Sequence, residues 1–313
     1  MELSRWVHLI GAFAAGILMA LQGRLNGGLS TFIGSGIEAA LINFSSGLVI
    51  LLFIVLLVPS VRRGVVRIPA AIRVGELNRW QLLGGLIGGA VVAVQSIAVP
   101  IVGVAVFTVA AIAGQSANSL FVDKVGLGPA GKQPITWNRA ISAILAVVAV
   151  GVAVSDRFTS GGASLIVVAV SFVGGVGLAV QQAINARVSN AARNPISATF
   201  YNFILGTAIL SSAFGVAWAL TDIDPGQLVG ANWWLYLGGA IGIAFITIAA
   251  WAVPVIGVLV FALVSISGQL VGALVIDVVA PTAATYVGWH LLAGALIAFL
   301  AVALGARGRL RVS

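Results

Sequence analysis

The stretch AVPIVGVAVFTVAAIAGQ at residues 98–115 decides the fold, because the chain repeats it as AVPVIGVLVFALVSISGQ at residues 252–269. The offset is 154 residues (252 − 98), and it also aligns Trp80, Gly84, Gly88 and Asp123 with Trp234, Gly238, Gly242 and Asp277. An offset of 159 residues (181 − 22) aligns Gln22, Asn26, Asn43 and Phe44 with Gln181, Asn185, Asn202 and Phe203. Matches in one order along the chain indicate an internal repeat. We place its two copies at residues 1–157 and 158–313.

The composition is that of an integral membrane protein. Hydrophobic residues make up 60% of the chain, charged residues 8%, and the mean hydropathy is +1.15, whereas a soluble domain carries about 25% charged residues. Each helical span needs roughly 20 apolar residues, so 313 residues leave room for about ten spans. The apolar runs predict an all-α protein with ten transmembrane helices, at residues 6–29, 36–58, 80–99, 101–122, 137–154, 163–188, 196–219, 233–252, 254–276 and 285–305.

Five helices in each copy require the second copy to enter the membrane from the opposite face. The charges agree with this inversion. The segment after the second helix carries five arginines, at positions 62, 63, 67, 73 and 79, whereas its counterpart after the seventh helix carries Asp222 and Asp224 and no basic residue. Inverted repeats are typical of secondary transporters, in which two related halves alternate around one central site.

The basic residues also predict the orientation. Of the 16 lysines and arginines, only Arg24 and Arg157 lie on the side away from the termini, which leaves fourteen (16 − 2) on the side of both termini. The positive-inside rule therefore places both termini in the cytoplasm, in a multi-pass protein of the cell inner membrane. The net charge of +8 follows from this topology, so we expect no nucleic-acid partner.

Amides inside the apolar runs are the candidate substrate-binding residues. Gln22 and Asn26 share one helix face, as do Gln181 and Asn185. Asn43, Asn202, Gln115 and Gln269 lie on helices that could reach the same region, and Trp251 could add an aromatic wall. Polar groups at this depth often mark a transport pathway. The alternative is that they only join helices through hydrogen bonds.

Few groups could couple transport to protons. The candidates are His290, Asp123 and Asp277, for which the alternatives are a structural histidine and carboxylates that cap or pair at helix ends. Arg24 either extends to the outer headgroups or attracts anions to a vestibule. The chain has no cysteine and only two histidines. We therefore expect no metal site, no cofactor and no enzymatic chemistry.

The paired motifs resemble a known family. The two stretches quoted first look like the turn and following helix of the drug/metabolite transporter (DMT, EamA-like) superfamily. The pairs LQGRLN…INFSSG and VQQAIN…YNFILG are similar to its YdcZ-like (DUF606) branch, here as two fused five-helix copies. This resemblance implies a ten-helix bundle with a central substrate cavity.

Together these features predict a secondary transporter that moves a small polar or amphipathic organic metabolite or drug by alternating access. The alternatives are a lipid flippase of the same fold and an accessory subunit without a cavity. The expected partners are the substrate and the lipid bilayer, and a homodimer is compatible with the sequence.

Overall fold

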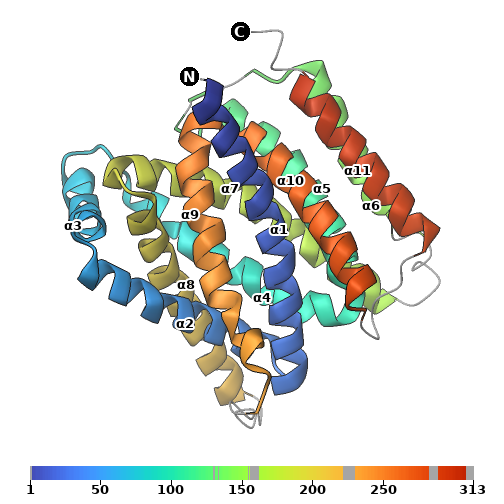
Figure 1. Cartoon of the computed structure of the whole chain (residues 1–313), viewed down its shortest axis with the longest axis horizontal. Coiled ribbons are helices and arrows are strands. Elements are labelled where there is room, and N and C mark those ends of the chain that lie inside the picture. Colours follow the sequence, from blue (N-terminus) through green and yellow to red (C-terminus); the bar gives the residue numbers. More distant parts are fainter. Residues whose placement is uncertain are drawn as a thin grey trace.

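The computed structural model describes residues 2–129, 131–132, 134–153, 155, 162–220, 230–281 and 288–307. These residues form helices joined by short connections (Figure 1). The long helices of the first half are α1 (Glu2–Ile33), α2 (Gly36–Leu57), α4 (Gly84–Val102), α5 (Val104–Val125) and α6 (Trp137–Ala153). Those of the second half are α7 (Gly162–Ala192), α8 (Pro195–Leu220), α9 (Gly238–Ile256), α10 (Val258–Val279) and α11 (Trp289–Arg307). Two short 3-10 helices, η1 (Arg79–Leu83) and η3 (Trp233–Leu237), lead into α4 and α9.

The structure confirms the prediction of an all-helical fold with long apolar helices. Among the described residues, eight helices are long and apolar enough to cross a membrane: α1, α2, α4, α5, α7, α8, α9 and α10. Two shorter apolar stretches, Ala140–Ala153 of α6 and Trp289–Ala301 of α11, lie where the fifth and tenth spans are expected. The count of ten spans and the side of the termini remain predictions.

The arginine-rich segment after α2 folds into a further helix, α3 (Pro59–Arg73), which the apolar runs do not predict. Pro59 stands at its first turn, where the missing N–H costs nothing. Val61, Gly64, Ile68 and Ala71 recur at helical spacing and are buried, and this face packs against α7 and α8. The segment is therefore a fixed amphipathic helix.

The two halves exchange their first helices. α1 packs along α9 and α10 of the second half, and α7 packs along α4 and α5 of the first half. α2 crosses α8 on one side of the bundle, and α6 pairs with α11 at the opposite edge (Figure 1). We refer to this exchange as the interleaved packing of the halves.

Paired glycines allow the closest of these crossings. A Cβ on Gly16 of α1 would overlap the Ser265 carbonyl of α10, and one on Gly268 of α10 would overlap the Phe13 carbonyl of α1. The equivalent pair in the other crossing is Gly175 of α7 and Gly114 of α5, whose Cβ atoms would overlap backbone carbonyls in the same way. Small residues let helices in membranes pack this closely.

The repeated stretches at residues 98–115 and 252–269 each contain a break between two helices, and this break comes later in the chain than predicted. Pro100 and Pro254 lie inside the last turns of α4 and α9, so both helices run past the expected ends at residues 99 and 252. The break comes at Gly103 and Gly257, whose φ angles are 82° and 81°. This conformation favours glycine, so glycine and not proline ends each helix.

Candidate binding cavity

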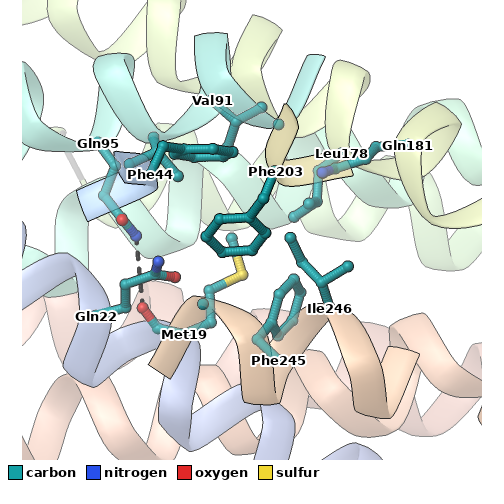
Figure 2. A pocket seen from close by; sticks show the side chains of 13 residues that line it. Met19, Gln22, Phe44, Val91, Gln95, Leu178, Gln181, Phe203, Phe245 and Ile246 are labelled. Atoms are coloured by element: carbon teal, nitrogen blue, oxygen red, sulfur yellow. Dashed lines mark hydrogen bonds between the residues drawn. The ribbon is translucent and has the colours of Figure 1, made fainter. Parts of the chain in front are cut away.

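A small cavity lies where α2 meets α8 (Figure 2). Six helices supply its lining, three from each half: α1, α2 and α4 from the first, and α7, α8 and α9 from the second. Its volume is about 20 Å³, which is room for one or two water molecules. The cavity is thus a shared site of the two halves.

Aromatic and aliphatic side chains form most of the wall. Phe44 and its repeat equivalent Phe203 lie against each other, with ring centroids 4.8 Å apart. Met19, Leu178, Phe245 and Ile246 complete the apolar part, and Figure 2 shows them around the two rings. The polar side chains in the wall are Gln22, Gln95 and Gln181. The lining therefore offers neutral hydrogen-bonding groups and aromatic faces, without a charged side chain among the described residues.

The amides of the first half form a continuous buried network. Asn43 of α2 donates to Asn26 Oδ1 of α1, and Asn26 Nδ2 donates to Gln95 Oε1 of α4 over 3.1 Å. Gln95 Nε2 in turn donates to the Met19 carbonyl over 3.4 Å. Gln22 Nε2 donates to the Gly238 carbonyl at the start of α9 over 3.2 Å. The first three hydrogen bonds join α1, α2 and α4, and the separate bond of Gln22 joins α1 to α9.

The second half repeats the core of this network. Asn202 Nδ2 of α8 donates to Asn185 Oδ1 of α7 over 3.2 Å, which matches the pair Asn43–Asn26. Gln181 occupies the cavity wall opposite Gln22. The Oδ1 atoms of Asn43 and Asn202, which are repeat equivalents, are both buried without a hydrogen-bond partner. Buried polar atoms without partners are rare in native structures, so each half retains one unused acceptor beside its amide pair.

Glycines explain how the amides fit between the helices. A Cβ on Gly84 or Gly88 of α4 would overlap the Asn185 or Gln181 side chain. In the other half, a Cβ on Gly238 would lie 2.5 Å from Asn26 Oδ1, and one on Gly242 would lie 2.6 Å from Gln22 Nε2. The two amides of α1 thus pack against two glycines of α9, and the two amides of α7 pack against two glycines of α4. This packing explains why both copies of the repeat have glycine at these two positions.

Two of the nine expected site residues, Gln22 and Gln181, are among the described residues that line this cavity. Asn26, Asn43, Asn185 and Asn202 do not line it and are buried in the hydrogen-bonded pairs described above. The other three lie elsewhere. Gln115 is fully buried between α5 and α7, where its Nε2 donates to Gln182 Oε1 over 3.1 Å. Gln269 donates to Ser265 Oγ within α10 over 3.2 Å. Trp251 is 37% exposed and stacks on His8, with ring centroids 3.9 Å apart. The structure does not bring these three side chains to Gln22 and Gln181. Gln115 and Gln269 instead make hydrogen bonds that support helix packing, as the alternative interpretation of the amides predicts.

The coupling candidates also lie away from the cavity. Asp277 Oδ2 accepts a hydrogen bond from the Ala105 amide, over 2.9 Å, at the start of α5, which is a helix-capping contact. Asp123 is buried near the end of α5. His290 is half-buried, and its ring lies against Trp289 with centroids 3.6 Å apart. Their coupling role remains a prediction.

Gln95 lines the cavity but is not among the binding residues that the sequence predicts. It is a single amide in the apolar run of α4, and its repeat equivalent at the offset of 154 is Ala249. Gln95 is therefore not one of the polar positions that the two halves share. Its side chain lies against Gly23, where a Cβ would come within 2.9 Å of Nε2. The signal that could have identified it is a lone buried amide within an apolar span.

Two arginines fasten helix ends at opposite ends of the bundle. Arg24 of α1 donates to the Ala280 carbonyl at the end of α10 over 3.0 Å. Arg187 of α7 donates to the Leu127 and Gly126 carbonyls, just after α5, over 2.6 and 2.7 Å. Because α1 matches α7 and α10 matches α5, the two contacts join equivalent helices, although Arg24 aligns with Ala183 and not with Arg187 at the offset of 159. We call them the Arg24 latch and the Arg187 latch.

Comparison with known proteins supplies a family and a fold. The model of a protein family described as "Putative inner membrane exporter, YdcZ" matches residues 7–152 and 166–304. A solved structure named "Crystal structure of protein" has 18% sequence identity and a TM-score of 0.59, and the similarity covers 99% of each chain. This identity supports a shared fold alone. No protein with curated function matches the chain.

Proposed function

Because this chain belongs to the YdcZ-like branch of the drug/metabolite transporters, a family of inner membrane exporters, we propose that it is a secondary transporter working by alternating access. Its cargo is a small polar or amphipathic organic solute. The observation that carries this proposal is the symmetry of the site: equivalent amides and phenylalanines from two inverted halves meet at one cavity. Such symmetry supports a site that opens in turn to either face.

The chemistry of the wall supports a neutral recognition mode. Gln22, Gln95 and Gln181 line the cavity and can donate and accept hydrogen bonds. The buried Oδ1 atoms of Asn43 and Asn202 are not part of the wall, and in our proposal they accept from a donor on the solute only when the halves move apart. Phe44 and Phe203 offer ring faces to an apolar part. A solute with hydrogen-bond donors and a compact apolar group matches this combination.

Binding requires the halves to move apart. Sites for small organic molecules usually measure about 300 to 1,000 Å³, whereas the cavity measures about 20 Å³. The Arg24 latch and the Arg187 latch are both formed, which fits a closed cavity. In the cycle that we propose, one latch opens while the other holds its end of the bundle shut.

The proposed orientation completes this description. The fourteen-to-two distribution of basic residues favours cytoplasmic termini, with α6 and α11 as the fifth and tenth spans. The Arg187 latch then lies at the cytoplasmic end and the Arg24 latch at the outer end. Release of the first opens the cavity to the cytoplasm, and release of the second opens it to the exterior.

Cysteine labelling tests the proposal, because the natural chain has no cysteine. Gln22→Cys and Gln181→Cys should react with a membrane-impermeant maleimide, and the reactive side should change when the conformational balance is shifted. Gln115→Cys is the matched control, since this buried glutamine lies between α5 and α7 and not in the cavity; it should stay unlabelled. Protection of all three positions from both sides would contradict a transport pathway here.

Removing one latch should open one side of the cavity. Arg187→Gln loses two charge-assisted hydrogen bonds, each worth about 1.5 to 3 kcal/mol, so cytoplasmic labelling of Gln181→Cys should accelerate roughly tenfold or more. Arg24→Gln is the mirrored control and should accelerate labelling from the exterior instead. Equal acceleration from both sides by either variant would show general loosening and refute the latch mechanism.

A further inference from the structure

A second, larger cavity opens on the surface between α3 and the turn that joins α7 to α8. We call it the α3 groove. It has a volume of about 470 Å³. Three arginines line it: Arg63 and Arg67 from α3 and Arg193 from the turn. Ser60 and Asn194 add polar groups, and no carboxylate is present among the described lining residues.

The groove has fixed walls. Arg67 Nε donates to the Ala191 carbonyl at the end of α7 over 3.0 Å, and Ser197 Oγ of α8 donates to the Val61 carbonyl of α3 over 2.8 Å. Gly64 lies so close to Ser197 that a Cβ would overlap its hydroxyl. α3 is thus held against α7 and α8 by contacts that leave the arginine side of the groove open.

Most of the donor groups of the three arginines in the groove have no partner among the described residues. The Arg63 and Arg193 side chains make no hydrogen bond or ion pair with any described residue. Arg67 uses only its Nε, which leaves the two terminal nitrogens available. Arginine binds phosphate oxygens through paired N–H groups, so three guanidinium groups around one concave space favour a phosphate-bearing ligand.

Apolar surface adjoins these charges. Val66, 68% exposed, lines the groove, and Leu57, 77% exposed, ends the membrane-spanning helix α2 immediately before α3. An amphipathic helix that continues a span and carries arginines lies at the membrane boundary, where anionic headgroups concentrate. A free phosphate would use the arginines and leave the adjoining apolar surface unused.

We propose that the α3 groove binds the phosphate of an anionic phospholipid headgroup, with Arg63, Arg67 and Arg193 as its ligands. The bound lipid would anchor α3, and through the Arg67 and Ser197 contacts also the ends of α7 and α8, to one leaflet. This site lies outside the central cavity and uses none of its residues.

Native mass spectrometry of the purified full-length protein tests this proposal with phosphatidylglycerol as the probe and phosphatidylcholine as the neutral reference. The test variant is Arg63→Gln with Arg193→Gly. Arg193 has a φ of 53°, which glycine adopts more readily, so this change should not weaken the fold. Losing two interfacial cations should lower the affinity for phosphatidylglycerol roughly 30-fold and leave phosphatidylcholine unaffected.

The matched control is Arg62→Gln with Arg73→Gln, which removes the same charge from exposed positions of α3 outside the groove. It should retain phosphatidylglycerol binding. An equal loss in both double variants would show general surface attraction, and displacement of the lipid by an equal concentration of inorganic phosphate would show a free-phosphate site; either result overturns the proposal. Thermal unfolding without lipid verifies that both variants fold. Transport is not measured, so the outcome is independent of the proposed function.

Discussion

Gly114→Leu is expected to prevent accumulation of folded protein. Even a Cβ at this position would overlap the Phe172 carbonyl of α7, and a backbone atom cannot move aside as a side chain can. Parting α5 from α7 also breaks the hydrogen bonds of Gln115 and Asn118 across the same interface. We expect a loss of about 3 kcal/mol or more, above the usual 1 to 3 kcal/mol of core overpacking. Size-exclusion chromatography and thermal unfolding in detergent would measure it.

Gly151→Leu is the matched control for this substitution. Gly151 lies in α6, also a candidate part of the membrane bundle, but no atom lies within 4 Å of the Cβ that a side chain would add. The variant should fold like the parent, with a gain of up to about 1 kcal/mol from helix propensity. Near-normal folding of Gly114→Leu, or equal damage from both variants, would show that close helix approach at Gly114 is unimportant.

The double variant Gln22→Ala with Gln181→Ala is expected to weaken solute binding while leaving folded protein in the membrane. Each substitution removes hydrogen-bonding groups from the cavity wall, and two such losses of about 0.5 to 1.5 kcal/mol each should weaken binding roughly 5- to 150-fold. The measurement is the thermal shift that compounds of a metabolite library produce in the parent protein, repeated on the variant.

Gln115→Ala separates loss of binding from loss of packing. This variant leaves Gln182 unpaired between α5 and α7 and should lower the stability by about 1 to 3 kcal/mol. Because Gln115 does not line the cavity, the thermal shifts caused by solutes should persist. If the double variant responded to the same compounds as strongly as the parent, the assignment of Gln22 and Gln181 to the site would be wrong.

Hydropathy and the internal repeat predicted the helices and the amide pairs well, because both depend on spacing along one helix. Gln22 and Asn26 share a face by the geometry of any α-helix, and the structure places Gln22 in the cavity wall with Asn26 directly behind it. The family is likewise confirmed. The cavity lined by both halves agrees with the prediction from the repeat, whereas the inverted orientation of the halves stays a prediction.

The side-chain contacts that the sequence could not predict depend on which helices pack against each other. Gln115 and Gln182 pair with each other because α5 lies on α7, and Trp251 turns to His8 because α9 lies on α1; neither neighbour can be read from periodicity. Gln95 could not be predicted as a binding residue from the repeat, because it has no polar equivalent in the other half. α3 could not be predicted from continuous apolar runs, because its buried face is one side of an amphipathic helix.

The interleaved packing has a consequence for biosynthesis. Gly16 of α1 crosses Gly268 of α10, so the first helix meets this partner only after 252 further residues (268 − 16) have been made. At roughly 5 to 20 residues per second, α1 waits about 10 to 50 seconds beside the translocon. During this interval Gln22 lacks its acceptor at Gly238. The growing chain therefore carries an unsatisfied polar helix in the lipid, or shielded by an insertion factor, until α9 and α10 have been made.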